Sequence, residues 1–206
     1  MRLFGGGEAR NSDPSKQRVP RHSSGWNSLR TFLKDQESLR VLDIGPTSST
    51  NINLLTSWGH SIYMSDLVGE AQNNIWIRPD AEPGQEFDAE AFLNANLPDS
   101  GRLFDVVLFW DAADYLPKAL VGPLFERLHA TMASGGRLLV FGHVKPETGF
   151  HRYHLRDDEQ VDVQPVSALP VANIYTNRQL ETLLHTFATY RFFLAKDNLR
   201  EVLVNR

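Results

Sequence analysis

The spacing of hydrophobic residues along the first part of the chain predicts alternating helices and strands. Apolar residues recur at helical spacing over residues 26–37 and again over 50–58. The short apolar segments 40–45 and 61–65, which separate and follow these helices, are predicted to be strands. A strand, a helix and a strand within about 27 residues form a βαβ unit. Such a unit predicts parallel strands joined by a right-handed crossover.

The middle of the chain is irregular at first and then strongly apolar. We expect a short strand at residues 74–77 and a short helix over 86–93. Residues 104–110 and 137–141 are nearly continuously apolar, which is typical of strands covered on both faces. A helical segment is predicted over 117–132, between these two strands.

The last third of the chain predicts a change to antiparallel strands. Residues 150–166 alternate around an acidic turn and are expected to form a β-hairpin. A helix is predicted to begin at Thr176 or Asn177, and residues 190–195 and 199–204 are predicted to form a second hairpin. The expected fold class is therefore α/β. We expect a Rossmann-like, doubly wound and mostly parallel seven-stranded sheet with an antiparallel C-terminal hairpin.

The N-terminal segment differs from the rest of the chain in composition and charge. Residues 1–25 are rich in Gly, Ser, Pro and Arg, and contain too little apolar surface to offset the entropy of ordering them. Their charge is +3, which leaves −7 for the rest of a chain whose net charge is −4. We therefore expect a disordered basic tail over 1–25 and a single domain over 26–206. An arm that binds an anionic partner is the alternative interpretation of the tail.

The composition is that of a soluble globular protein and excludes several classes of function. The 206 residues are 41% hydrophobic and 22% charged, and no apolar stretch approaches the length of a membrane span. No secretory signal is present, so a cytoplasmic protein is expected. The absence of cysteine excludes disulfide scaffolds, cysteine nucleophiles and thiolate metal sites. The acidic domain lacks a basic stripe with stacking aromatics, so we expect no nucleic-acid partner.

Candidate chemistry lies where the predicted strands end, because ligands of doubly wound sheets bind at the carboxyl edge. The segment 43–49 leads from a strand into a helix through small residues, which brings backbone N–H groups up to a ligand. Asp66 follows the neighbouring strand, and its carboxylate can accept hydrogen bonds from both hydroxyls of a ribose. The alternative is an ordinary strand-to-helix turn with a helix-capping acid.

Five short segments stand out in chain order: residues 41–45 (Val-Leu-Asp-Ile-Gly), Asp66, residues 97–111, residues 115–117 and residues 135–140. In their order and spacing they make residues 38–206 resemble the class I S-adenosylmethionine-dependent methyltransferases. The resemblance implies S-adenosylmethionine as the cofactor and methyl transfer as the reaction.

The resemblance also implies which residues hold the cofactor. The loop 45–49 would surround its methionine part with Asp43 near the amino group, Asp66 would hold the ribose, and the end of the fourth strand would border the methyl group. The implied cofactor-binding residues are Asp43, Gly45, Pro46, Thr47, Ser48, Ser49, Asp66, Leu67, Asn94, Trp110 and Asp111. The chain departs from the family pattern at Thr47 and Ser49, which replace glycines of the loop, and at Leu93, which replaces an acid. Asn94 is a polar substitute for that acid.

Residues on the same rim are candidates for acid–base chemistry and for holding the methyl acceptor. His143 and Asp111 are the expected catalytic residues. The expected acceptor-binding residues are Tyr115, His143, Phe150 and Tyr153, with residues 143–175 as a lid over the acceptor. Capping and packing of the next helix is the alternative role for Tyr115. No metal site is expected, because His151 and His154 belong to opposite faces of one strand.

The acceptor and two rival functions remain to be distinguished. The segment 110–113 (Trp-Asp-Ala-Ala) differs from the motif used on amino groups of bases, so a small-molecule or lipid-like acceptor is expected. A methyltransferase-like binding or scaffold protein without catalysis is the first rival, because the loop has lost glycines. A nicotinamide-dependent oxidoreductase is the second, although residues 45–50 keep one of the three glycines that such enzymes use.

Overall fold

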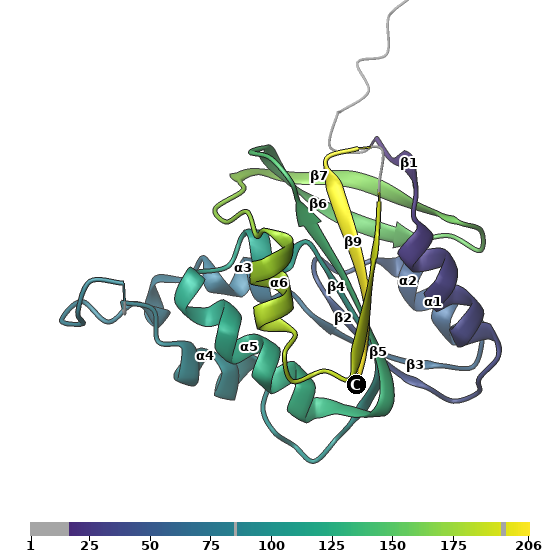
Figure 1. The fold of residues 1–206 in the computed structure, drawn as a ribbon, viewed down its shortest axis with the longest axis horizontal. Coiled ribbons are helices and arrows are strands. Elements are labelled where there is room, and N and C mark those ends of the chain that lie inside the picture. The colour runs from purple at the N-terminus through teal and green to yellow at the C-terminus, as the bar shows by residue number, and fades with distance from the viewer. Residues whose placement is uncertain (1–16, 85, 195–196) are drawn as a thin grey trace, which may run out of the picture.

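Two β-sheets organise the protein (Figure 1), and the computed structural model describes residues 17–84, 86–194 and 197–206. The main sheet has six strands in the order β3-β2-β4-β5-β9-β8. These are β2 (Arg40–Ile44), β3 (Ser61–Ser65), β4 (Phe104–Trp110), β5 (Met132–His143), β8 (Thr189–Phe193) and β9 (Leu199–Asn205). The first four strands in this order run parallel, and β9 runs antiparallel to both β5 and β8. The predicted α/β fold with a mostly parallel sheet and a closing antiparallel hairpin is confirmed.

The prediction of seven strands in this sheet is wrong for the described residues. Residues 74–77 do not extend along β3. Instead they form a short 3-10 helix, η2 (Asn74–Trp76), followed by an isolated bridge between Ile77 and Phe87. The Trp76 indole Nε1 donates to the carbonyl of Glu70, and its ring packs edge-on against Phe92. These contacts fold the segment back onto neighbouring helices and leave β3 at the edge of the sheet.

Helices cover both faces of the main sheet (Figure 1), as expected for a doubly wound fold. One face carries α1 (Ser24–Lys34) and α2 (Ser49–Ser57). The other carries α3 (Leu67–Ala71), α4 (Ala89–Asn96), α5 (Lys118–Thr131) and α6 (Asn177–Leu183). No helix among the described residues is both long enough and apolar enough to cross a membrane.

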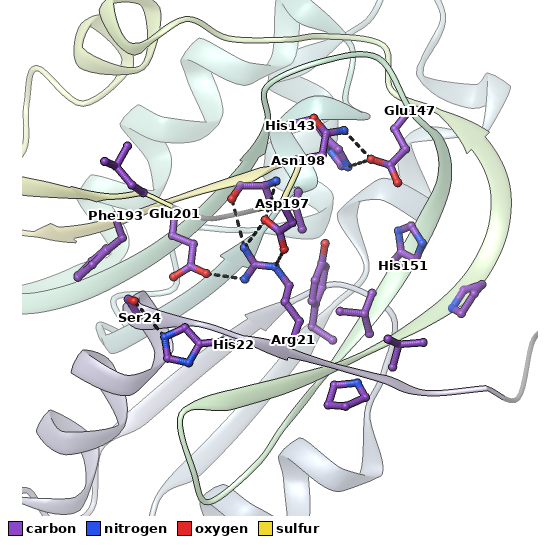
Figure 2. A pocket seen from close by; sticks show the side chains of 17 residues that line it. Arg21, His22, Ser24, His143, Glu147, His151, Phe193, Asp197, Asn198 and Glu201 are labelled. Atoms are coloured by element: carbon purple, nitrogen blue, oxygen red, sulfur yellow. Dashed lines mark hydrogen bonds and ion pairs between the residues drawn. The ribbon is translucent and has the colours of Figure 1, made fainter.

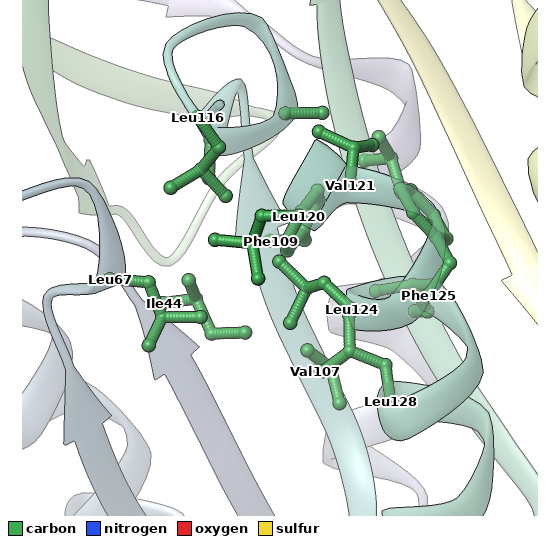
Figure 3. Packing of buried hydrophobic residues seen from close by; sticks show 14 of the residues in the cluster. Ile44, Leu67, Val107, Phe109, Leu116, Leu120, Val121, Leu124, Phe125 and Leu128 are labelled. Atoms are coloured by element: carbon green, nitrogen blue, oxygen red, sulfur yellow. The ribbon is translucent and has the colours of Figure 1, made fainter. Parts of the chain in front are cut away.

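Strand β4 shows why the central strands are apolar throughout. Val106 and Leu108 face the cluster that α1 and α2 complete, whereas Val107 and Phe109 face α5. Figure 3 shows the second contact, in which apolar side chains at helical spacing along α5 pack on β4. Because side chains alternate between the two faces of a strand, burial on both faces requires an unbroken apolar run.

The second sheet is antiparallel and lies across the upper edge of the main sheet in Figure 1. It contains the predicted hairpin, β6 (Thr148–Leu155) and β7 (Gln160–Pro170), and a strand that the pattern did not predict, β1 (Val19–His22). Its inner side chains, including Tyr153 and Leu155, join the cluster under α1 and α2.

Strand β1 occupies part of the segment expected to be a tail. The tail was assigned to residues 1–25, but residues 19–22 pair with β7, and Ser23 caps α1 by accepting from the backbone N–H of Trp26. This strand is held by main-chain pairing with β7 and by ion pairs of Arg21 with Asp197 and Glu201. Because neither interaction depends on apolar side chains, the hydrophobic pattern did not predict the strand. The rest of the assigned tail, residues 1–16, lies outside the described residues.

Candidate active site

The carboxyl ends of β2 and β4 meet at a buried carboxylate. Asp43, at the end of β2, is 2% exposed. Its Oδ1 accepts a hydrogen bond of 2.7 Å from the Trp110 indole Nε1, and its Oδ2 accepts one of 2.7 Å from the Asn51 side chain. Burial raises the pKa of Asp43 to about 6 against the opposing effect of these two hydrogen bonds. Both carboxylate oxygens are therefore occupied by donors from the protein.

Asn51 connects this carboxylate to the second sheet. It lies in the first turn of α2 and is 1% exposed. Its Nδ2 also donates to the backbone carbonyl of Tyr153 at 3.1 Å, and its Oδ1 accepts from the backbone N–H of Leu155 at 2.7 Å. One buried amide therefore fastens β6 to the end of β2. Asn51 was not among the predicted site residues, because a polar residue in the first turn of a helix usually faces solvent.

The Trp110 ring fills the space above Gly45. The backbone of Trp110 has φ of +51°, a left-handed conformation that non-glycine residues rarely adopt. The indole stacks on Tyr153 with ring centres 4.9 Å apart and meets Phe141 edge-on. A Cβ atom on Gly45 would lie 3.5 Å from Cδ1 of the indole. The cavity that remains between this loop, Trp110 and Tyr153 measures about 10 Å³.

A second buried carboxyl lies directly after β4. Asp111 is 1% exposed, and its Oδ2 accepts a hydrogen bond of 2.7 Å from the Tyr153 hydroxyl. Burial raises the pKa of Asp111 to about 7, and the hydrogen bond from Tyr153 opposes that rise. Tyr153 is thus linked to the ends of both strands. Its backbone carbonyl accepts from Asn51, which bonds Asp43 at the end of β2, and its hydroxyl donates to Asp111 after β4.

His143 and Asp114 form a buried pair at the end of β5. Asp114 closes the short 3-10 helix η3 (Ala112–Asp114), and its Oδ2 accepts from the backbone N–H of His143 at 2.6 Å and from Nδ1 at 2.8 Å. Burial alone would lower the pKa of His143, but this hydrogen bond and the charges of Asp111, Asp114 and Glu147 outweigh it and raise the pKa. Because Nδ1 carries the donated proton, Nε2 of the neutral ring is an acceptor.

Replacing Asp114 by asparagine is expected to lower the pKa of His143, because the neutral amide removes the negative charge that favours the imidazolium form. An NMR titration of the His143 ring in the wild type and in Asp114→Asn measures this pKa. Glu126→Gln, an exposed charge change on α5, is the control and should leave the titration unaltered. An unchanged His143 titration in Asp114→Asn would contradict the assignment of the pair.

A cavity of about 860 Å³ lies between the two sheets beside His143. Figure 2 shows His143, Glu147 and His151 on one side of it, and Arg21 bonded to Asp197 and Glu201. Strands β1, β6 and β7 and the ends of β8 and β9 supply the wall. Tyr153 and His151 line both this cavity and the small one beside Gly45, so they separate the two spaces.

Some polar groups of the loop 45–49, which follows β2, form hydrogen bonds within the protein. The N–H of Gly45 donates to the carbonyl of Ser65 at 3.0 Å. Ser48 caps α2 by accepting from the N–H of Asn51, and its Oγ lies 2.8 Å from Nδ1 of His154. Thr47 and Ser49 are exposed, and Pro46 lines the small cavity.

The predicted ribose-binding residue occupies the expected place. Asp66 follows β3 and caps α3, and its Oδ1 accepts from the N–H of Gly69 at 3.0 Å. Its carboxylate is half-buried at the carboxyl edge of the sheet. Leu67, predicted beside it, has a fully buried side chain that packs in the core.

Asn94 is not brought to this edge. It lies exposed on α4, where its Oδ1 accepts a hydrogen bond of 3.0 Å from Arg127 near the end of α5. In Figure 1, α4 lies below, towards the edge opposite the second sheet.

Tyr115 and Phe150 lie behind the cavity rather than in its wall. Their rings pack edge-on with centres 5.0 Å apart, and the Tyr115 hydroxyl donates to the carbonyl of Gly149 at 2.6 Å. Tyr115 also meets the His143 ring edge-on at 5.9 Å. Phe150 lines the small cavity. Of the four predicted acceptor-binding residues, His143 and Tyr153 therefore line the large cavity.

Comparison with known protein families shows to which family the chain belongs. A family described as a methyltransferase domain matches residues 23–187, which is most of the chain. The chain belongs to the methyltransferase-domain family. The predicted family is therefore confirmed. No curated protein sequence matches this methyltransferase significantly.

Solved structures of other methyltransferases resemble this one at low sequence identity. The 1,6-didemethyltoxoflavin-N1-methyltransferase of Burkholderia thailandensis is 15% identical with a TM-score of 0.46, over 89% of this chain and 77% of its own. The magnesium protoporphyrin IX methyltransferase of Synechocystis PCC 6803 is 15% identical with a TM-score of 0.48, over 88% and 77%. A methyltransferase of Methanosarcina mazei is 14% identical with a TM-score of 0.49, over 83% and 93%.

The strand ends of this methyltransferase do not fit S-adenosylmethionine as they are arranged. The space beside Gly45 is about 10 Å³, which is roughly the volume needed by one water molecule. The carboxylate of Asp43, expected near the cofactor's amino group, is already paired on both oxygens. A ligand group larger than water could enter the space beside Gly45 only if Trp110 or Tyr153 moved.

Within the described residues, the methyltransferase has no group of three or more His, Asp or Glu side chains arranged to hold a metal ion. His154 points to Ser48, whereas His151 lines the cavity, so the two ring systems diverge as their spacing along the strand predicts.

Proposed function

We propose that the protein is an S-adenosylmethionine-dependent methyltransferase whose acceptor is a small molecule bound in the cavity between the two sheets. One observation carries the proposal. A cavity of about 860 Å³ opens at the carboxyl end of β5, and Tyr153 and His151 line both this cavity and the small one beside the strand-end loop. A volume of this size suits a small organic molecule.

His143 is proposed as the general base for the acceptor. The residue lines the cavity, its Nε2 lies 3.7 Å from Oε2 of Glu147, another lining residue, and Asp114 holds the proton on Nδ1 and fixes the ring orientation. The ring can therefore take a proton from a hydroxyl or an amine of the acceptor at Nε2. Asp111 is the poorer candidate, because its carboxyl is bonded to Tyr153 and lies outside the wall of the large cavity.

The segment 143–175 is proposed as the lid over the acceptor. Strands β6 and β7, which make up most of it, supply His151, Tyr153, Val163 and Pro165 to the cavity wall. Movement of β6 away from Asn51 would withdraw Tyr153 from Trp110 and enlarge the space beside Gly45. The lid would thus control access to both spaces.

The cofactor is proposed to enter this enlarged space, where the loop 45–49 and Asp66 would hold it and it would supply the methyl group. Support comes from the half-buried carboxylate of Asp66 and from the exposed Thr47 and Ser49 at the start of α2. Asn94 has no part in this arrangement.

A second candidate function is a methyltransferase-like protein that binds a small molecule without catalysis. The observation that favours it is the stacked pair of Trp110 and Tyr153, which fills the space that a cofactor would need. The two candidates make opposite predictions for cofactor binding.

Calorimetric titration with S-adenosylmethionine and S-adenosylhomocysteine separates them. The proposed enzyme binds both, and each ligand raises the melting temperature because it binds the folded state. Mass spectrometry of the purified protein for retained cofactor is a second measurement. If neither ligand produces heat or a thermal shift at millimolar concentration, the proposal is wrong and the binding protein is the better description. Reduced nicotinamide cofactor in the same titration tests the oxidoreductase.

A further inference from the structure

The large cavity has a polar end whose chemistry differs from the rest of its wall. His143, Glu147 and His151 lie there, on β5, the following turn and β6 (Figure 2). Glu147 Oε2 lies 3.7 Å from Nε2 of His143 and accepts a hydrogen bond of 2.6 Å from the Asn198 side chain. Its side chain is 42% exposed. Among the described residues, no lysine or arginine pairs with Glu147.

The one arginine among the described residues of the wall is not available to a ligand. Arg21 donates to both carboxylate oxygens of Asp197, at 2.6 and 3.1 Å, and also pairs with Glu201. It donates as well to the carbonyl of Leu199. Glu201 is in turn occupied by Ser23 and by the N–H of Gly25. This group is self-contained and leaves one negative charge in excess.

The described wall contains three carboxylates, those of Glu147, Asp197 and Glu201, and one guanidinium group, that of Arg21. The carboxylates therefore exceed the guanidinium groups by two. The imidazole of His151 is half-buried, and burial lowers its pKa, which favours the neutral ring. A neutral imidazole and a carboxylate are hydrogen-bond acceptors. Glu147 and the imidazole of His151 therefore attract a cation or a donor and repel an anion.

Apolar side chains form much of the remaining wall. They come from β1, β7, β8 and the start of β9, namely Val19, Pro20, Val163, Pro165, Phe193 and Leu199. Pro165 pairs with His151 across β6 and β7, so the apolar surface begins beside the polar end. Burial of a ligand's hydrocarbon surface against these side chains is favourable because it removes apolar area from water.

We propose that this cavity binds a small molecule that has an amine head group and an apolar body. The ammonium group pairs with Glu147 and donates to the imidazole of His151, while the body lies along the apolar wall. As a statement about the methyl acceptor, this rests on the proposed function. As a statement about a binding site, it does not require that the protein bind a cofactor.

Three probes of one shape test the site: 3-phenylpropylamine, 3-phenylpropanol and 3-phenylpropionate, each titrated calorimetrically into the full chain without cofactor at pH 7.5. We expect the amine to bind at least tenfold more tightly than the carboxylate, with the alcohol between them. Equal binding of the amine and the carboxylate, or tighter binding of the carboxylate, overturns the proposal.

Glu147→Gln tests the residue that the proposal depends on. We expect it to weaken binding of the amine about tenfold and to leave binding of the alcohol unchanged. Glu181→Gln on α6 makes the same change in net charge on an exposed side chain outside the cavity, and should leave all three affinities unchanged. If both variants weaken amine binding equally, the attraction is a general effect of charge and the assigned site is wrong.

The two proposals fail in different ways. If the amine binds but neither S-adenosylmethionine nor S-adenosylhomocysteine does, the amine site stands and the methyltransferase function fails. If the cofactor binds and the amine binds no better than the carboxylate, the methyltransferase function stands and the amine site fails.

Discussion

Replacing Asn51 by alanine is expected to lower the free energy of unfolding by about 4 kcal/mol, since each buried group left without its partner costs roughly 1–3 kcal/mol. Alanine would leave three such groups behind, namely the Asp43 carboxylate, the carbonyl of Tyr153 and the N–H of Leu155. Urea denaturation followed by circular dichroism measures the change.

Asn53→Ala provides a matched control for this measurement. Asn53 is exposed on the same helix, two residues further along, and its replacement should change the stability by less than about 0.5 kcal/mol. If Asn51→Ala lowers the stability no more than Asn53→Ala does, Asn51 does not fasten the second sheet to β2.

Replacing Trp110 by glycine is expected to open the space beside Gly45 and to tighten binding of S-adenosylmethionine at least tenfold. In the wild type, binding must first displace the stacked rings, which reduces the apparent affinity by the fraction of molecules that are open. Loss of the buried ring should also lower the free energy of unfolding by about 3 kcal/mol. Glycine is chosen because φ at this position is +51°, where a side chain is strained.

Calorimetric titration with S-adenosylmethionine measures the affinity, and urea denaturation the stability. Trp58→Ala is the control, because Trp58 lies at the other end of α2 and stacks on Trp26 rather than on the strand-end groups. It should not tighten cofactor binding. Equal or weaker cofactor binding by Trp110→Gly than by the wild type would show that this ring does not block the site.

Strand β4, which is buried on both faces, could be predicted from the sequence to the residue, whereas β5 begins at Met132 and ends at His143, beyond both ends of the predicted strand 137–141. Strand β4 occupies the predicted residues 104–110, because an apolar run of that length has no stable alternative outside the core. The capping residue Thr176 was likewise visible, and its side chain and that of Gln179 form a capping box in α6.

Elements held by pairing with distant parts of the chain could not be predicted. Strand β1 has exposed or half-buried side chains and exists because β7 offers it a free edge more than 130 residues away. Residues 74–77 have the composition of a strand, but the Trp76 ring finds its contacts on Phe92 and so keeps the segment away from β3.

The places of the candidate site residues in the fold were predicted better than their side-chain contacts and backbone conformations. His143, Asp111 and Asp43 all lie at the carboxyl edge, as their place after strands implies. The sequence carries no sign, however, of the backbone angle at Trp110 that turns the indole towards Asp43. Asn94 was placed by a resemblance in a segment that folds as α4, so its side chain faces Arg127 instead.

The stacked pair of Trp110 and Tyr153 also gives the protein a built-in optical reporter. Two aromatic rings with centres 4.9 Å apart and planes 12° apart, both buried in a fixed environment, are a source of near-ultraviolet circular dichroism. Separation of the rings would change that signal while the helices and strands, and hence the far-ultraviolet spectrum, stay intact. Motion of the β6–β7 hairpin can thus be followed in solution without any added label.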